Sequence, residues 1–223
     1  MRFLFDPAAG AERIVLKNEP FKYLIKVRRH KAGDTVALRR PDETATLYRY
    51  EIASVDGRRA ELTLQDARDF PVAARKSLHI GWCRIDPRSV EKVLPQLNEL
   101  GVAKITFLPC ERSQRQFRTD FARWRRILEA SMQQCGRSER MALEEAPSLE
   151  TFLAAHPDTV VLDFAENVLE DAAGIETVLI GCEGGFSDAE RETLSQYRTV
   201  RLDTPMTLRS ESAAAAVAAK ILL

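Results

Sequence analysis

Short runs of alternating apolar and polar residues occupy the N-terminal third of the chain, and such runs are typical of half-buried β-strands. They predict strands at residues 2–5, 35–39, 44–52 and 60–65. Within this N-terminal third, helical spacing is found only at residues 20–30. Turns are predicted at Gly33-Asp34, Pro41-Asp42 and Asp56-Gly57. Closely spaced strands with one helix favour a small β-barrel, which we assign to a first domain of residues 1–71.

A polar connector follows at residues 71–76, and after it strand-like and helix-like segments alternate. Strands are predicted at residues 78–82, 105–108, 159–164, 178–180 and 199–202. Helices are predicted near residues 90–100, 121–135, 188–196 and 211–223. This alternation predicts an α/β domain over residues 76–223, with a parallel sheet and helices on both of its faces.

Two of these helices carry informative side chains. In the helix at residues 121–135, apolar residues recur at helical spacing and are predicted to be buried: Phe121, Trp124, Leu128, Met132 and Cys135. The last helix is rich in alanine, and small side chains permit close approach of another helix. High helix propensity is the alternative explanation for the alanines.

Charge is balanced overall, with 33 basic and 33 acidic residues, but it is unevenly distributed. Residues 112–140 hold 8 arginines against 3 acids, whereas residues 141–192 hold 13 acids and a single basic residue. Arginine-rich stretches favour contacts with phosphates and bases, so this segregation favours RNA binding. Two solvated faces that balance each other are the alternative.

The cysteine pattern and the absence of long apolar runs indicate the cellular compartment. Cys83, Cys110, Cys135 and Cys182 lack Cys-x-x-Cys spacing, and the chain has only 3 histidines. We therefore expect neither a metal site nor a disulfide framework, as suits a reducing cytosol. Neither a signal peptide nor a membrane span is predicted, so we expect a soluble, cytoplasmic protein without membrane contact.

Two segments near the C-terminus have the character of ligand-binding loops. Residues 180–187 follow an apolar run of strand length, contain three glycines, and end at Ser187, which with Glu190 has the spacing of a capping box. Residues 208–213 precede the last helix in the same way. The glycine spacing matches neither a dinucleotide-binding fingerprint nor a P-loop. A plain strand-to-helix turn is the alternative reading of the first segment.

These two segments resemble the final motifs of the SPOUT class of methyltransferases. Within that class the chain is most similar to the ribosomal small subunit methyltransferase E family, whose members read Gly-Pro-Glu-Gly-Gly and later Leu-Arg-x-Glu-Thr-Ala. Further segments match the family in order: residues 23–34, Glu99-Leu100-Gly101-Val102, Glu111-Arg112-Ser113 and Gln134-Cys135-Gly136-Arg137. The resemblance thus covers nearly the whole chain.

The resemblance implies both a fold and a function. The fold is α/β, with an N-terminal PUA-like small β-barrel that binds RNA and a C-terminal SPOUT α/β domain that has a parallel sheet and a deep trefoil knot. The function is S-adenosylmethionine-dependent methylation of N3 of a specific uridine in 16S rRNA, on the small ribosomal subunit. The resemblance also implies a homodimer formed through the SPOUT domain. No metal is expected, because S-adenosylmethionine already carries a sulfonium leaving group.

The resemblance also assigns residues to the cofactor and to the RNA. The S-adenosylmethionine loops map onto Leu162, Phe164, Ile180, Gly181, Cys182, Glu183, Gly184, Gly185, Leu202, Thr207, Leu208 and Ser212. The RNA side maps onto Lys26, Arg29, Glu111, Arg112, Gln134 and Arg137. A structural salt bridge is the alternative role for Glu111 and Arg112.

Transfer to N3 of uracil requires loss of the N3 proton and stabilisation of the uracil anion that develops. Arg209 is the candidate for the stabilising cation, because it lies in the last motif loop. Glu211 or Glu183 could accept the proton, although an acid in the first turn of a helix is also explained by the helix dipole.

Some positions depart from the family pattern. Cys182 stands where proline is usual, Ser212 replaces threonine, and residues 203–206 differ from the family before the last motif. These departures concern individual contacts and not the class. Two other functions stay open beside the assignment. One is a SPOUT enzyme that methylates a ribose 2′-hydroxyl or another base, and the other is a non-catalytic RNA-binding protein of ribosome assembly. Donor binding separates the enzymes from the binding protein.

Overall fold

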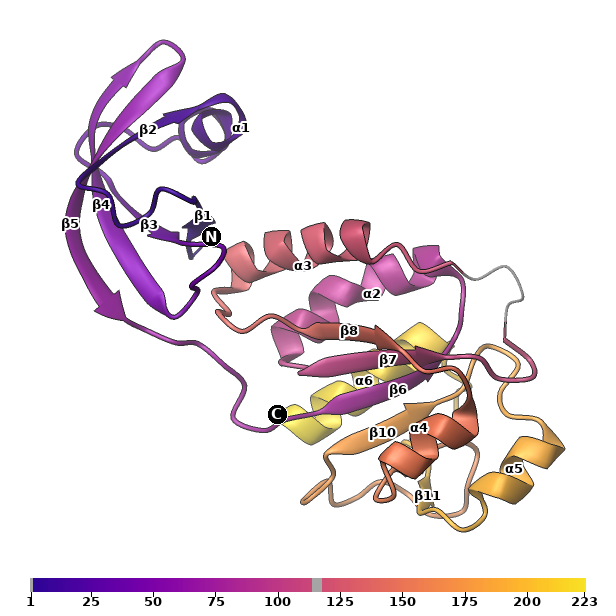
Figure 1. Ribbon diagram of the computed structural model, residues 1–223. Helices are drawn as coiled ribbons and strands as arrows, with labels where there is room; N and C mark the ends of the chain where they lie inside the picture. The colour runs from indigo at the N-terminus through magenta and orange to yellow at the C-terminus, as the bar shows by residue number, and fades with distance from the viewer. Residues whose placement is uncertain (1, 114–117) are drawn as a thin grey trace. The chain divides into compact units, whose positions relative to one another are not determined.

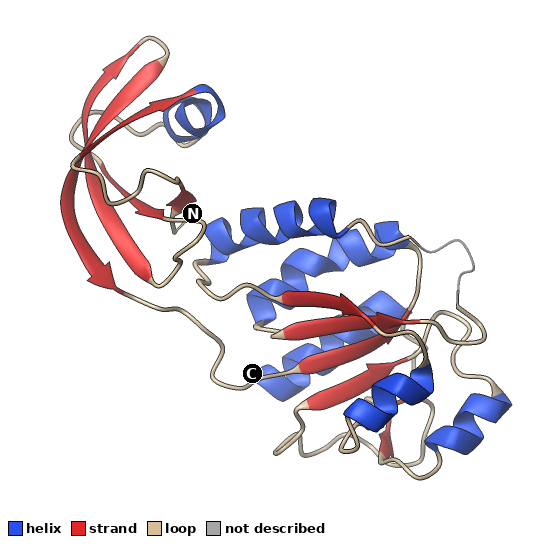
Figure 2. Ribbon diagram, in the orientation of Figure 1, coloured by secondary structure: helices blue, strands red, loops and turns tan. Residues whose placement is uncertain are grey.

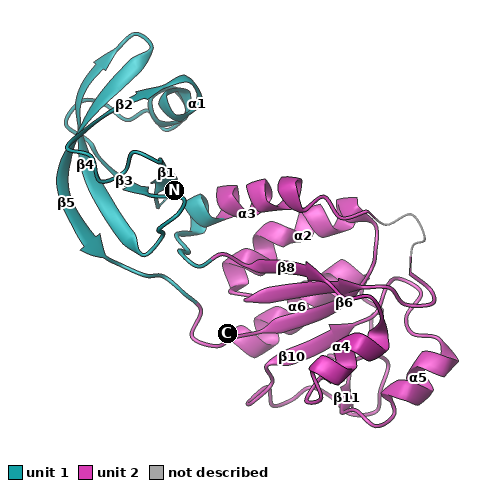
Figure 3. Ribbon diagram, in the orientation of Figure 1, with its two compact units in different colours: residues 1–73, 132–139 teal, residues 74–131, 140–223 magenta. Residues whose placement is uncertain are grey.

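The computed structural model describes residues 2–113 and 118–223, and these residues form two compact units (Figure 3). Unit 1 combines Met1–Ala73 with Met132–Glu139, and unit 2 combines Ala74–Ser131 with Arg140–Leu223. A segment distant in the sequence therefore completes unit 1.

Unit 1 is built on a five-stranded sheet of order β1-β3-β4-β5-β2 (Figure 1). Its strands are β1 (Leu4–Phe5), β2 (Arg13–Lys17), β3 (Thr35–Arg39), β4 (Thr46–Asp56) and β5 (Arg59–Asp69). The neighbours are antiparallel except for the parallel pair β1 and β3. Register shifts interrupt the long β4–β5 pairing, and shifts of this kind bend a sheet. Strand β2 lies in a segment for which the sequence predicted no strand.

The helical stretch predicted at residues 20–30 is shorter in the structure and irregular. Helix α1 (Asn18–Phe21) continues into a π-helix, η1 (Lys22–Val27). The turn ends where Arg28 N–H donates to the Tyr23 carbonyl and Arg29 adopts a φ of 60°. A left-handed residue cannot continue a right-handed helix, which explains the early end.

The chain segment from Met132 joins unit 1 through hydrogen bonds to the N-terminal strand. The carbonyl of Gln133 accepts from the N–H of Arg2 at 2.9 Å, and its side-chain oxygen accepts from Phe5 N–H at 2.9 Å. Met132 is buried in a cluster with Phe3 and Leu47. The last turn of helix α3 (Phe121–Cys135) therefore belongs to unit 1, while its first turns belong to unit 2.

Unit 2 contains a wholly parallel sheet of order β11-β9-β10-β6-β7-β8 (Figure 2). Its strands are β6 (His79–Cys83), β7 (Lys104–Leu108), β8 (Ala142–Glu145), β9 (Val160–Leu162), β10 (Thr177–Ile180) and β11 (Thr199–Val200). Besides α3, its helices are α2 (Pro87–Leu100), α4 (Leu149–Ala155), α5 (Asp188–Leu194) and α6 (Ser210–Leu222). The predicted α/β class is confirmed. Within the described residues, no helix is long and apolar enough to cross a membrane.

Neighbouring residues of the central strand β6 show that helices cover both faces of this sheet. Successive strand residues point to opposite faces. A Cβ on Gly81 would lie 2.3 Å from the ring of Phe152, so α4 packs directly on that face. On the opposite face the indole Nε1 of Trp82 donates to Ser210 Oγ in α6 at 2.8 Å.

The cysteines depart from the expectation that the chain has no disulfide. Cys83 and Cys110 form one, with their Cα atoms 5.7 Å apart, whereas Cys135 and Cys182 are free. The pairing follows from the sheet. Cys83 ends β6, Cys110 follows the end of β7, and these strands are parallel neighbours. Sequence spacing alone cannot reveal which strand ends are adjacent.

Candidate functional site

A cavity of about 380 Å³ opens where three loops of unit 2 meet at the carboxyl edge of the parallel sheet. The loops follow β9, follow β10 and precede α6. Open parallel sheets bind their ligands at this edge. The cavity is lined by Leu162, Asp163, Phe164, Ile180, Gly181, Cys182, Glu183, Gly184, Gly185, Arg191, Arg201, Leu202, Thr204, Met206, Thr207, Leu208, Arg209, Ser210 and Ala213.

The glycine loop between β10 and α5 (Gly181–Phe186) is shaped by glycine and fixed by a helix cap. Gly185 has a φ of 66°, a conformation that residues with a Cβ rarely adopt. The predicted capping box is confirmed: Ser187 Oγ accepts from Glu190 N–H at 3.2 Å, and Glu190 Oε2 accepts from Ser187 N–H at 2.8 Å. Burial raises the pKa of the Cys182 thiol within the loop. The loop is therefore a fixed turn.

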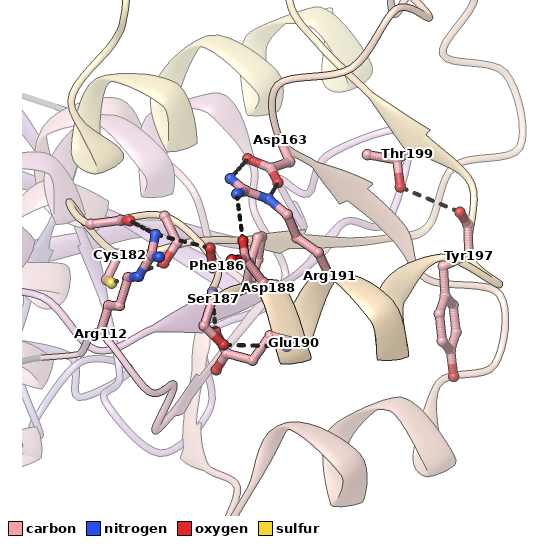
Figure 4. Close-up of polar contacts among 12 residues, drawn as sticks. Arg112, Asp163, Cys182, Phe186, Ser187, Asp188, Glu190, Arg191, Tyr197 and Thr199 are labelled. Atoms are coloured by element: carbon pink, nitrogen blue, oxygen red, sulfur yellow. Dashed lines mark hydrogen bonds and ion pairs between the residues drawn. The ribbon is translucent and has the colours of Figure 1, made fainter.

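A loop that is not one of these three, the one after β7, contacts the glycine loop through hydrogen bonds (Figure 4). Arg112 donates from Nη1 to the carbonyl oxygens of Gly184 at 3.0 Å and Phe186 at 3.2 Å. The N–H of Glu111 donates to Glu190 Oε1 at 2.8 Å. The guanidinium of Arg112, expected to face RNA, is thus engaged by the glycine loop, and its contacts are not a salt bridge.

The loop after β9 and the loop before α6 are each fixed by a polar side chain that the sequence did not single out. Asp163, which follows β9, accepts from Arg191 Nε at 2.9 Å. Ser210 at the start of α6 donates to the Gly181 carbonyl at 2.6 Å, which joins the two motif segments. Both contacts connect residues more than 25 positions apart, so sequence spacing gave no sign of them.

The structure brings nearly all residues assigned to the cofactor to this one cavity. Eleven of the twelve are among the described residues that line it, and the exception is Ser212. The lining residues not assigned from the sequence are Asp163, Arg191, Arg201, Thr204, Met206, Ser210 and Ala213, apart from the catalytic candidate Arg209. Most of them are sequence neighbours of the motif residues, so they could have been predicted from their position in the same loops.

The charges at the cavity divide into paired and unpaired side chains. Arg191 pairs with Asp163, and Arg201 lies 3.8 Å from Asp203. The side chains of Arg209 and Glu183 are exposed and make no hydrogen bond or ion pair to another described residue. One free cation and one free anion therefore face the cavity. Within the described chain, no group of three or more His, Cys, Asp or Glu side chains could hold a metal ion.

The candidate base Glu211 is half-buried at the start of α6. It occupies the first turn of α6, and it is not among the described residues that line the cavity. Its position is explained by the favourable interaction of an acid with the N-terminal end of a helix. Of the two candidate proton acceptors, Glu183 is the one placed at the cavity.

The residues assigned to RNA in unit 1 differ in exposure. Lys26, Arg29 and Gln134 are exposed, so their side chains are free to meet a ligand. Arg137 departs from the expectation, because its side chain is 6% exposed and lies 3.9 Å from Glu139. Burial lowers the pKa of the Arg137 guanidinium. A guanidinium buried to this extent packs inside unit 1 and presents little surface to an RNA ligand.

The chain is similar over its whole length to proteins of one family. A family model described as an RNA methyltransferase domain matches residues 73–222. Two proteins from strains of Helicobacter pylori, each named ribosomal RNA small subunit methyltransferase E, are 37% and 36% identical over 222 residues. Each alignment covers 98% of this chain and 98% of the relative.

Solved structures share the fold. A ribosomal RNA small subunit methyltransferase E from Neisseria gonorrhoeae, bound to S-adenosylmethionine, has a TM-score of 0.75 at 18% identity, with 98% of this chain and 95% of that chain covered. A methyltransferase from Legionella pneumophila, in complex with the same cofactor, has a TM-score of 0.77 at 23% identity, with 99% and 96% covered. Both units are therefore arranged internally as in these structures.

Proposed function

We propose, on the premise that this chain belongs to the ribosomal RNA small subunit methyltransferase E family, that it methylates N3 of a uridine in 16S rRNA. As a member of that family it is an rRNA methyltransferase that uses S-adenosylmethionine. The cavity at the three loops is the proposed donor site. The observation that carries this proposal is that both motif segments, far apart in the sequence, line one cavity.

The cavity suits the donor in size and in chemistry. Its volume of about 380 Å³ lies in the range of small-molecule sites, roughly 300–1,000 Å³. Apolar side chains such as Leu162 and Leu202 can pack on a flat base, and the backbone of the glycine loop can bind polar groups. A Cβ on Gly181 would lie 3.4 Å from the Phe186 ring and 3.4 Å from the Gly185 Cα, so the loop closes tightly on itself at this point. When bound, S-adenosylmethionine supplies a methyl group on a positively charged sulfonium.

The two free charges are the proposed catalytic groups. Uracil N3 carries a weakly acidic proton between two carbonyls, so N3 becomes a nucleophile as this proton leaves. Arg209 stabilises the negative charge that develops on the uracil carbonyls. Glu183 accepts the N3 proton, directly or through water, and its place at the cavity favours it over Glu211. Because N3 lies on the pairing edge, the uridine must be unpaired or flipped.

Unit 1 is the proposed RNA-binding module, with a PUA-like fold. Its mostly antiparallel sheet with one helical segment supports this, as do the exposed side chains of Lys26, Arg29 and Gln134. Phosphate contacts from such residues release counterions, so RNA affinity is expected to fall steeply with salt. Glu111 and Arg112 on the β7 loop of unit 2 are the other exposed candidates for RNA contact, and the guanidinium of Arg112 is engaged by the glycine loop.

Unit 2 is proposed to carry the deep trefoil knot of its class and to form the homodimer. The small, half-buried side chains of Ala213, Ala215 and Ala216 on α6 support a close helix contact between two copies. The small ribosomal subunit as substrate places the protein in the cytoplasm.

Transfer of labelled methyl groups to small subunits that lack the modification tests the proposal. Nucleoside analysis is expected to show label in 3-methyluridine. Label on a ribose or on another base would retain an RNA methyltransferase but contradict the uridine N3 assignment. Failure of transfer to subunits and to free rRNA, together with failure to bind S-adenosylmethionine, would leave an RNA-binding protein of the same fold.

A further inference from the structure

We propose that Asp163 and Arg191 are a positioning pair, which holds two walls of the donor cavity at the distance that S-adenosylmethionine requires. This inference rests on the proposed function of the cavity as the donor site. It adds two residues to that site which no motif of the chain contains.

The carboxylate of Asp163 is nearly buried, and both of its oxygens contact the guanidinium of Arg191. Asp163 directly follows β9, and its N–H donates to the Val200 carbonyl of the neighbouring strand region at 3.1 Å. Its side chain is 9% exposed. The two oxygens accept from Arg191 Nε at 2.9 Å and from Nη2 at 3.5 Å. A carboxylate with both oxygens turned toward one guanidinium positions the loop that carries it.

Arg191 connects this carboxylate to the glycine loop. It lies in α5, the helix that the capping box fixes to the end of that loop, and Figure 4 shows its guanidinium turned toward Asp163. A Cβ built on Gly185 would lie 3.7 Å from Arg191 Nη2, so the same guanidinium also passes close to the loop backbone. The ion pair thus bridges the loop after β9 and the loop after β10.

Both residues line the cavity, and the bridge therefore acts directly on its shape. Phe164, the neighbour of Asp163 at the cavity wall, is 73% exposed and has little packing of its own to hold it. Without the pair, the loop after β9 would have to be ordered by the donor itself, and that ordering costs binding free energy. The pair is expected to raise donor affinity without touching the reacting atoms.

A second acid near Arg191 provides a matched control. Asp188 lies 3.9 Å from Arg191 Nη1, but its side chain is 97% exposed. Exposed ion pairs contribute little. Asp188→Asn therefore makes the same chemical change beside the same arginine, away from the cavity, and is expected to leave donor binding within twofold.

Calorimetric titration of S-adenosylmethionine into the full-length protein tests the pair. Asp163→Asn and Arg191→Gln are each expected to raise the donor Kd about tenfold. Donor KM should rise in parallel, with kcat at saturating donor within twofold. The double variant should be no weaker than either single variant, because both remove one shared interaction. Arg191→Lys, which keeps a charge, should restore part of the affinity.

Three outcomes would overturn the inference. One is an unchanged donor Kd in folded Asp163→Asn and Arg191→Gln, with only their thermal stability lowered, because a purely structural pair behaves in that way. Another is a double variant whose loss is the product of the two single losses. If the unaltered protein does not bind the donor, the proposed function of the cavity fails and the pair falls with it. If the unaltered protein binds the donor and the variants bind it with the same Kd, only the positioning role of the pair is contradicted.

Discussion

Ser210 donates a hydrogen bond of 2.6 Å to the carbonyl oxygen of Gly181, and this contact joins the start of α6 to the start of the glycine loop. The same hydroxyl accepts from the indole Nε1 of Trp82 at 2.8 Å. Trp82 is fully buried and Ser210 is 6% exposed, so the hydroxyl meets the polar requirements of both neighbours inside the core. The floor of the cavity is thereby tied to the central strand of the sheet.

Ser210→Ala is expected to destabilise the protein and to weaken donor binding. It leaves the Trp82 N–H and the Gly181 carbonyl without this partner, at a cost of about 1–3 kcal/mol. Urea unfolding measures the stability, and titration of S-adenosylmethionine measures the binding. Ser195→Ala, an exposed hydroxyl on the same unit, should stay within about 0.5 kcal/mol of the unaltered protein. Equal stability of the two variants would contradict this role of Ser210.

Arg112→Ala is expected to weaken donor binding even when RNA is absent. The change removes the hydrogen bonds to the Gly184 and Phe186 carbonyls, which hold the glycine loop in its turn. We expect the donor Kd to rise about tenfold, equivalent to ~1.4 kcal/mol. Titration of S-adenosylmethionine into the RNA-free protein measures this effect.

Arg118→Ala provides the control for Arg112, because it removes another exposed arginine from the same connection between β7 and α3. It should leave the donor Kd unchanged. If Arg112→Ala also leaves the donor Kd unchanged and weakens only RNA binding, then Arg112 serves the RNA, as the sequence suggested, and the contacts to the glycine loop are incidental.

Much of the fold could be predicted because local pattern and tertiary burial agree. Helix α3 has the predicted bounds Phe121–Cys135, and Trp124, Leu128 and Met132 are buried as its spacing indicated. Strand β8 escaped prediction because its sequence, Ala142–Glu145, is a mostly exposed edge strand without apolar alternation. Its hydrogen bonds come from β7, and that tertiary neighbour cannot be read from local pattern.

The site divides in the same way. The glycine loop could be predicted because Ser187 and Glu190 sit three positions apart and act within one turn. The pairs Asp163–Arg191 and Cys83–Cys110 could not, since each joins residues from different strands or helices. Arg112 was recognised as part of a motif, but only the fold shows that it binds backbone carbonyls of the glycine loop.

The stability of the protein is expected to fall as the pH drops from about 6.5 to 4. Burial, aided by the neighbouring His156, lowers the pKa of His79 from 6.5 to about 4. In this window the unfolded chain binds a proton at His79 that the folded protein does not, so acid favours unfolding, and above pH 6.5 the effect vanishes. Thermal unfolding at several pH values measures it. His79→Gln should flatten this part of the profile, and an unchanged profile would contradict the account.

Reduction of the Cys83–Cys110 disulfide is expected to lower the free energy of unfolding. The bond links residues separated by 27 positions, and a cross-link of that span restricts the unfolded chain by about 3–4 kcal/mol in the chain-entropy estimate. Urea unfolding with and without dithiothreitol measures the difference. The double variant Cys83→Ser/Cys110→Ser should match the reduced protein and ignore the reductant. A protein whose stability is insensitive to the reductant would contradict the contribution of this bond.

The most direct test of the account is the single-turnover rate of 3-methyluridine formation by Arg209→Ala at saturating S-adenosylmethionine. Arg209 lines the cavity, and its side chain makes no hydrogen bond or ion pair to another described residue. Loss of one group that stabilises developing charge costs roughly 10²- to 10³-fold in rate. We expect a fall of that size with the donor Kd within threefold, and partial recovery in Arg209→Lys. A rate within threefold of the unaltered enzyme would contradict the proposed catalytic role of Arg209.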